Sequence, residues 1–213
     1  MKGVHVRFYL ASTSPARLAT LRSSGIEPVV VPSEVDEEAL VAQVEETEGR
    51  PLTPEELVLL LAQAKAEAVL TPEMEGFVLG GDSAFVLDGV IYGKPHTPDV
   101  ARERWHMQRG RTGKLYSGHW LIHHSGGHTL NAVGEVTVAE VTFSSDITDA
   151  EIEAYIASGE PLKVAGAFTI DSLGAAFIDH ISGDPSTVVG VSVPALRRMA
   201  NRLGVLWPGL WNR

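Results

Sequence analysis

The 213-residue sequence contains no cysteine, and this absence removes several kinds of site at once. Disulfide bonds, metal sites built on thiolates and a cysteine nucleophile are all excluded. Basic side chains are also scarce, because 17 lysines and arginines stand against 27 acidic residues and leave a formal charge of -10. Such a chain is a poor non-specific ligand for nucleic acid or an anionic membrane. A phosphate-bearing small molecule stays compatible with this charge, because a few placed cations can outweigh the global field locally.

The sequence also lacks an apolar run long enough to span a bilayer. Its N-terminal apolar run is broken by Arg7 and is too short for a secretory signal. We therefore expect a cytoplasmic protein. Hydrophobic residues make up 44% and charged residues 21% of the chain, which is an ordinary globular balance able to bury a sizeable core in one large domain or two small lobes.

Short β-prone runs alternate with helical patterns, as is typical of an α/β or α+β fold. The longest helical pattern, Thr53–Leu70, begins with a capping threonine, a proline and two glutamates. The acidic stretch Val35–Gly49 indicates a loop with an exposed helix, and Asp88-Gly89 and the glycines within His123–Leu130 predict hairpin turns. The other expected helices are Leu18–Ser23, Pro98–Gln108, Asp149–Ser158 and Val193–Leu203, and the expected strands are Val4–Leu10, Glu27–Val31, Gly76–Gly80, Ala84–Leu87, Leu115–Ile122, Gly134–Phe143 and Ala175–Ile178.

The stretch "ASTSPARLATLR" places three hydroxyls and a proline where a strand turns into a helix. One interpretation is a helix start, in which Ser14 caps the helix and Arg17 faces water. The other is an anion site, because the unpaired N–H groups of a helix N-terminus attract phosphate. In that case Ser12 and Ser14 donate to phosphate oxygens, and Arg17 grips them with its planar guanidinium. Spacing alone favours the helix start.

Isolated charged residues follow other predicted strands. A hairpin over Val78–Pro95 can bring Asp82 near Lys94, as a cation-holding carboxylate beside a phosphate-binding lysine or as a structural salt bridge. Glu37 lies in an acidic loop, where such residues are usually just solvated. Lys65 lies on an alanine-rich helix that suggests close packing, so its side chain is either snorkelling or directed at a site.

Two further groups carry weaker signals. The glycine-rich segment Gly159–Pro194 contains Asp171 and reads as ordinary turn chemistry or as a close approach of backbone to a ligand. The histidines at positions 119, 123, 124 and 128 match no usual zinc spacing, so we interpret them as structural or solvated.

Six of these segments together, in this order, resemble the Maf family over nearly the whole chain. Each motif is weak alone, but six in register are highly specific. The segments are "LASTSPAR" (10–17), "SEVDE" (33–37), "LAQAKA" (61–66), "LGGDSAFVLDGVIYGKP" (79–95), "YIASGEPLKVAGAFTID" (155–171) and "GDPSTVVGVSVPAL" (183–196).

The resemblance implies one Maf-like domain over residues 1–213, with an elongated, twisted mixed sheet flanked by helices and two lobes around a central cleft. It implies a house-cleaning nucleoside triphosphate pyrophosphatase that releases a nucleoside monophosphate and pyrophosphate, acts on canonical or modified nucleotides, and uses Mg²⁺ or Mn²⁺. Members of the family often form homodimers, and some are linked to arrest of septum formation. The alternative is a regulator on the same scaffold that binds nucleotides without turning them over.

Carried over by position, Asp82 matches the catalytic carboxylate and proton acceptor, and Glu37 the acidic residue that helps hold metal or water. Lys65 and Lys94 match the two site lysines, and Ser12, Ser14 and Arg17 the phosphate-binding turn. Asp171 stands where many members have glutamine, and an acceptor-only carboxylate cannot donate as an amide does, so this position is expected to affect base selection. The other departures are Ala16 for the first arginine of S-P-R-R, Ser83 for threonine and Gly113 for histidine, which indicate an actinobacterial-looking subfamily.

Overall fold

The computed structural model describes residues 6–213 as two compact units. Unit 1 comprises residues 6–82, 117–137 and 190–213, and unit 2 comprises residues 83–116 and 138–189. The strands are β1 (Phe8–Ala11), β2 (Val29–Val30), β3 (Gly76–Leu87), β4 (Val90–Tyr92), β5 (Thr112–Ser125), β6 (His128–Phe143) and β7 (Ile178–Ser182). The α-helices are α1 (Pro15–Ser23), α2 (Glu37–Glu48), α3 (Pro54–Ala68), α4 (Pro98–Gln108), α5 (Asp149–Ala157), α6 (Pro185–Val189) and α7 (Val193–Arg202). Short 3₁₀ turns are η1 (Glu160–Lys163), η2 (Ala165–Ala167), η3 (Leu173–Phe177) and η4 (Trp207–Leu210).

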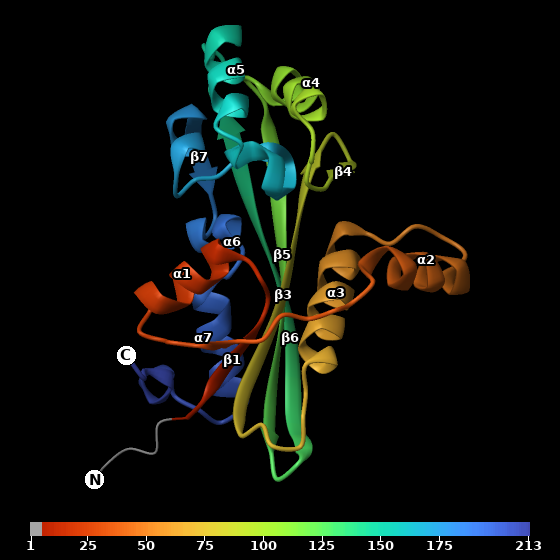
Figure 1. The fold of residues 1–213 in the computed structure, drawn as a ribbon, viewed down its shortest axis with the longest axis vertical. Helices are drawn as coiled ribbons and strands as arrows, with labels where there is room; N and C mark the ends of the chain where they lie inside the picture. The colour runs from red at the N-terminus through yellow and green to blue at the C-terminus, as the bar shows by residue number, and fades with distance from the viewer. Residues whose placement is uncertain (1–5) are drawn as a thin grey trace. The chain divides into compact units, whose positions relative to one another are not determined.

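These strands form one mixed sheet, as the α/β prediction requires. Within residues 6–213 the sheet has seven strands in the order β2-β1-β3-β5-β6-β7, with β4 paired to β3 (Figure 1). β1 runs parallel to β2 and β3, whereas β4 and β7 are antiparallel to their partners. No helix in this part of the chain is long and apolar enough to cross a membrane.

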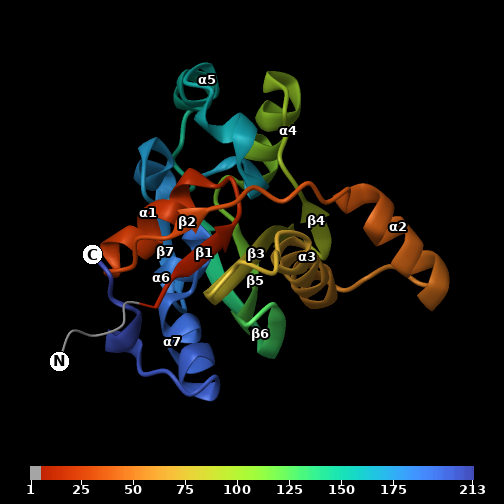
Figure 2. The same ribbon diagram turned by 60° about the horizontal axis from the view of Figure 1, so that its bottom comes forward.

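Both faces of β1 are buried, so its sequence is a continuous apolar run. Phe8 and Leu10 on one face of β1 pack in a core cluster with α1 and α7, whereas Tyr9 and Ala11 on the other face pack in a cluster with α3. Figures 1 and 2 show α1 and α7 on one side of β1 and α3 on the other. The strand β1, which leads into the turn that contains Ser12 and Ser14, therefore has helices packed on both of its faces.

The core of unit 2 is aromatic. The Trp105 ring lies edge-on to Tyr155, with centroids 5.3 Å apart, and to Phe143 at 5.6 Å. Its indole N–H donates to the carbonyl of Ala167 at 2.9 Å, so the polar atom of this buried side chain is satisfied. α4, α5 and the turns η1 to η3 pack around this cluster.

Several predicted elements are confirmed. Thr53 and Thr148 cap α3 and α5 through complete capping boxes, and the acidic stretch contains the exposed helix α2. Asp88-Gly89 turns β3 into β4, with φ of 51° and 80°. β5 and β6 meet at the glycine pair predicted as a hairpin turn.

Other boundaries were wrong. β3 is one continuous strand instead of the two predicted on either side of Asp82. The last strand is β7, beginning at Ile178, because residues from Leu173 to Phe177 form the turn η3. The short helix α6 was not predicted. Of the first predicted strand, Val4 and His5 lie outside the described residues.

Candidate active site

Two parallel strands of unit 1 position four of the predicted site residues, Ser12, Ser14, Arg17 and Asp82. β1 pairs in register with β3, so that Ala11 lies opposite Gly80. Beyond this pair the chain leaves β1 through Ser12, while β3 continues to Asp82. Because β1 ends at Ala11 opposite Gly80, the hydroxyl-rich turn after β1 lies beside the middle of β3, where Asp82 follows two residues after Gly80.

The turn after β1 begins helix α1 and also brings polar side chains together. Ser14 caps α1 by accepting from the backbone N–H of Arg17 at 3.3 Å, and Pro15 occupies the first helical turn, as one interpretation predicted. Ser12 is 7% exposed, and its hydroxyl accepts from Arg17 Nη1 at 3.0 Å and from the backbone N–H of Ser14 at 3.2 Å. The predicted Ser12, Ser14 and Arg17 therefore form one hydrogen-bonded group.

The Arg17 side chain turns inward, so the interpretation in which it faces water is wrong, and its binding of phosphate stays a prediction. Its Nε donates to the carbonyl of Gly190 at 3.1 Å, and a Cβ at Gly81 would lie only 3.3 Å from that Nε. Burial lowers the pKa of Arg17, and the negative charges of Asp82 and Glu37 oppose this effect. A guanidinium keeps its proton in proteins, so Arg17 supplies a fixed positive charge beside the two carboxylates.

Lys65 lies between those carboxylates. Its ammonium is 2.6 Å from Asp82 Oδ1 and 2.9 Å from Glu37 Oε1, and its side chain is 11% exposed. The Lys65 ammonium is therefore directed at the two carboxylates instead of snorkelling to water, and its part in a functional site stays a prediction. The close approach depends on Gly80, since a Cβ there would lie 2.0 Å from the carbonyl oxygen of Ala62 on α3.

The two carboxylates differ in environment. The Asp82 side chain is 15% exposed, whereas that of Glu37 is 48% exposed. Burial raises the pKa of Asp82, while Lys65 and Arg17 oppose this rise. A carboxyl group that is buried but flanked by cations is suited to accept a proton during a reaction.

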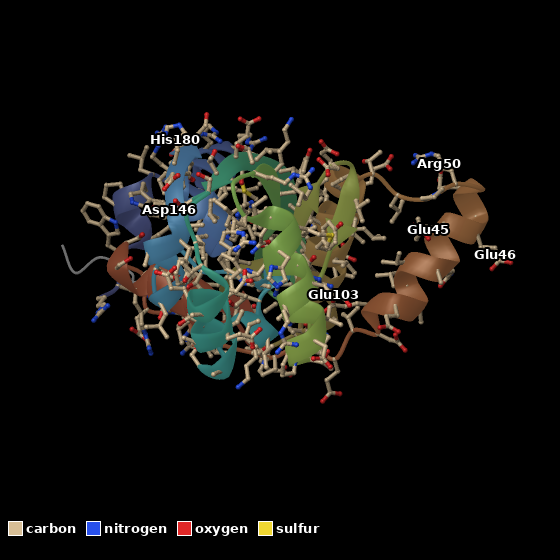
Figure 3. The ribbon with its side chains drawn as sticks, turned by 90° about the horizontal axis from the view of Figure 1, so that it is seen from above. Glu45, Glu46, Arg50, Glu103, Asp146 and His180 are labelled. Atoms are coloured by element: carbon tan, nitrogen blue, oxygen red, sulfur yellow. The ribbon has the colours of Figure 1, made fainter. Side chains whose placement is uncertain are left out.

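Glu37 is the first residue of α2, and Asp36 caps that helix by accepting from the N–H of Ala39 at 3.0 Å. α2 contains no buried residue, and Figure 1 shows it reaching away from α3. Figure 3 places Glu46 and Arg50 toward its far end. Within unit 1, Glu37 thus reaches Lys65 from an exposed helix and Asp82 reaches it from a buried strand.

A hard divalent cation fits this donor set. Asp82 and Glu37 already direct their carboxylate oxygens at one positive centre, the Lys65 ammonium. Mg²⁺ is usually bound through one or two carboxylates together with waters and substrate phosphates. Within residues 6–213 no cluster of three or more His, Asp or Glu side chains could hold a metal ion. Two carboxylates plus a phosphate ligand therefore match the chemistry of Mg²⁺ or Mn²⁺.

The other two predicted residues, Lys94 and Asp171, belong to unit 2, and their part in the site stays a prediction. Lys94 is exposed just after β4, where Arg104 donates to the carbonyl of Gly93 and stacks 5.5 Å from the centroid of the Tyr92 ring. The backbone N–H of His96 donates to the carbonyl of Leu162 at 3.1 Å. This bond links the Lys94 turn to the segment that leads to Asp171.

Glu160 holds that segment together. Its carboxylate accepts from the hydroxyls of Tyr155 at 2.9 Å and Thr169 at 2.5 Å, and from the backbone N–H of Gly174 at 3.1 Å. Although burial raises the pKa of Glu160, the hydrogen bonds dominate and hold it at about 2. Asp171 is exposed in the loop that these bonds close.

The sequence did not reveal three groups that hold the predicted site residues or their segments in place. Glu160 carries no signal that separates it from other loop acids, and the Gly190 carbonyl that accepts from Arg17 is backbone. His119 was grouped with the other histidines, yet it is fully buried and is hydrogen-bonded to the segment that follows Gly190. The departure at Gly113 has a steric reason, because a Cβ there would lie 2.2 Å from the Phe85 ring.

Comparison with known proteins identifies the family of the chain. A chain from Leifsonia xyli subsp. xyli named nucleoside triphosphate pyrophosphatase is 63% identical over 98% of both chains. A protein of the same name from Corynebacterium diphtheriae is 47% identical over 95% of this chain and 97% of its own. Among solved structures, the Staphylococcus aureus Ham1 protein matches 65% of this chain and 72% of its own, with a TM-score of 0.38 and 12% identity. The family model described as Maf-like protein matches residues 7–203, and the chain belongs to that family.

Proposed function

We propose that the protein hydrolyses nucleoside triphosphates, canonical or modified, to a nucleoside monophosphate and pyrophosphate. The observation that carries the proposal is the Lys65 ammonium lying 2.6 Å from Asp82 and 2.9 Å from Glu37, beside the guanidinium of Arg17. Relatives that match this chain over nearly its full length are named for this activity.

The reaction is attack of water on a phosphorus atom. The phosphoanhydride bond to the leaving pyrophosphate breaks, and the water proton passes to a base. Arg17 and Ser12 bind phosphate oxygens at the start of α1, where backbone N–H groups add positive potential. Asp82 accepts the proton. Lys65 keeps Asp82 ionised against its burial and offsets charge that develops on the phosphates, a role in which one donor is typically worth about 10²–10³ in rate.

The proposal includes Mg²⁺ or Mn²⁺ held by Asp82 and Glu37. Such a cation supplies charge neutralisation on the phosphates and lowers the pKa of water. Lys94 would contribute a further positive charge toward the phosphates. Asp171, which can only accept hydrogen bonds when ionised, would favour bases that present donors.

A screen of canonical and modified triphosphates with Mg²⁺, Mn²⁺ and Co²⁺ tests the proposal. Phosphate is measured by malachite green after added pyrophosphatase, and chromatography separates monophosphate from diphosphate products. We expect monophosphate with wild type and none with a folded Asp82→Asn variant. Near-normal turnover by that variant would refute the assignment of Asp82.

The alternative function is a non-catalytic nucleotide-binding regulator of septum formation. Ala16 favours it slightly, because one arginine expected in the phosphate-binding turn is absent. Asp82 and Lys65 favour the enzyme, because a binding module needs no buried base. Nucleotide binding by calorimetry without any product in the screen would establish the alternative.

The proposal extends to a cytoplasmic homodimer that does not bind nucleic acid. The family resemblance supports the dimer, and the formal charge of -10 disfavours nucleic acid as a ligand. Light scattering coupled to gel filtration measures the mass, and a value of one chain would exclude the dimer.

A further inference from the structure

His119 on β5 is fully buried and bridges two backbone segments of unit 1. The backbone N–H of Ser192 donates to its Nε2 at 2.9 Å, and its Nδ1 lies 3.2 Å from the carbonyl oxygen of Glu135 on β6. Since Nε2 accepts a hydrogen bond, it carries no proton. The proton is therefore on Nδ1 and is donated to Glu135, so His119 is a neutral imidazole in a single tautomer.

The segment that His119 holds also holds Arg17. Gly190, Val191 and Ser192 form a short turn between α6 and α7, and the carbonyl of Gly190 accepts from Arg17 Nε at 3.1 Å. Gly190 has φ of 108°, which side-chain-bearing residues rarely adopt. Val191 is fully buried in the core. The turn is thus fixed to His119 at one end and to Arg17 at the other.

Two hydrogen bonds in different directions fix the plane of the Arg17 guanidinium. Nε donates to Gly190, and Nη1 donates to Ser12 Oγ at 3.0 Å. A guanidinium presents its donors in a rigid fork, so rotating it moves all of them together. Because Ala16 supplies no second cation to this turn, binding of phosphate depends on how Arg17 is oriented.

We propose that His119 is a positioning residue that orients Arg17 for the triphosphate, acting through the turn formed by Gly190, Val191 and Ser192. The inference rests on the proposed function only in assigning Arg17 to phosphate binding. Loss of the Nε2 acceptor frees the Ser192 N–H, lets the Gly190 carbonyl shift, and weakens the hydrogen bond that this carbonyl accepts from Arg17 Nε.

Two substitutions at His119 test this role. His119→Leu removes both hydrogen bonds, and a misplacement of about 1 Å can cost about 10² in rate, so we expect kcat/KM to fall about 10- to 100-fold, mainly through KM. His119→Gln can accept from Ser192 and donate to Glu135, and should stay within about threefold of wild type, the scale of one modest hydrogen bond. Failure of glutamine to restore KM in a folded variant would overturn the proposal.

Substitutions at Ser192 test the same hydrogen bond by changing its donor, and they include a matched control. Ser192→Pro removes the N–H that His119 accepts, and the native φ of -69° already suits proline. Ser192→Ala keeps the N–H and removes only the hydroxyl that caps α7 at Ala195 N. We expect both variants to lower the melting temperature, but only proline to raise KM. Equal KM values for the two variants would contradict the proposal.

A double-mutant cycle separates positioning from general damage. If His119 acts through Arg17, His119→Leu should change pyrophosphate affinity less than about twofold in an Arg17→Ala background, because the interaction it supports is already gone. Equal losses in both backgrounds would overturn the inference. Pyrophosphate binding is measured by calorimetry, so the cycle decides this question even if the wild-type protein hydrolyses no triphosphate, a result that would refute only the proposed function.

Discussion

Lys65→Met tests whether the site lysine keeps Asp82 charged. Methionine is similarly unbranched and fits a buried position, but it removes the ammonium that lies 2.6 Å from Asp82 and 2.9 Å from Glu37. The main consequence is that the negative charge of a buried, ionised Asp82 loses its nearest positive partner. Its pKa, already raised by burial, should rise further because Lys65 is the largest influence that opposes burial.

The magnitude follows from the geometry. At an effective dielectric constant of about 20, opposite charges 2.6 Å apart attract by about 6 kcal/mol, and desolvation offsets part of this. Removing one partner of a buried pair costs about 3–5 kcal/mol. In a chain of this size each kcal/mol shifts the melting temperature by about 2–4 °C, so a loss of about 10 °C is expected near pH 8.

The loss should depend on pH in a definite direction. The folded-state pKa of Asp82 lies above its unfolded value, so wild type loses stability as pH rises through that pKa. The variant has a still higher pKa, so it loses additional stability up to that higher value. Below the wild-type pKa both proteins carry a neutral Asp82, and the difference in melting temperature should shrink toward zero.

Melting curves from pH 4 to 8 provide the assay, with Lys114→Met as a matched control. Lys114 is 53% exposed and lies 3.8 Å from Glu140, a pair worth about 0–1 kcal/mol, so its loss should matter little at any pH. Lys65→Met combined with Asp82→Asn should regain stability, since no unpaired aspartate charge is left. A Lys65→Met difference that does not change with pH from pH 4 to 8 would refute the reasoning.

Three further predictions concern other positions. Gly80→Ala places a Cβ 2.0 Å from the Ala62 carbonyl, so it should cost at least about 1–3 kcal/mol of unfolding free energy in urea titrations; a neutral result would show that α3 shifts freely. Glu160→Gln should lower the melting temperature above pH 5, with the deficit vanishing as pH falls toward about 2, because the lowered pKa stabilises the fold only while the carboxylate is ionised. Asp171→Gln should reorder kcat/KM among triphosphates with different bases, and an unchanged ranking would exclude a role in base selection.

The sequence predicts well where local chemistry decides. Thr53 and Thr148 reveal their helices because capping boxes satisfy backbone donors within four residues, and Asp88-Gly89 reveals its hairpin because the turn needs positive φ. Ser14 likewise identifies the start of α1. In each case the determining contacts lie within one or two turns of chain.

Prediction fails where partners are distant in sequence. Gly80 and Gly81 look like the end of a strand, but β3 continues through them, and position 80 needs glycine because α3 packs so close that no side chain fits. The direction of Arg17 depends on the carbonyl of Gly190, which lies 173 residues away. Lys65 could be assigned to a site only through family resemblance, since its spacing to Asp82 on another element is not visible in the chain.

The exposed helix α2 has a consequence for how the protein would bind its cation. A helix without buried residues opens locally at low free-energy cost. Two polar contacts of α2 to the rest of unit 1 join Glu37 to Lys65, and Glu45 to the N–H of Leu52 at 3.0 Å. Any ligand that binds Glu37 must order this helix, so the measured affinity includes that ordering. A substitution that lowers helix propensity at a solvent position such as Glu46, far along α2, would then weaken metal binding although that side chain does not touch the metal.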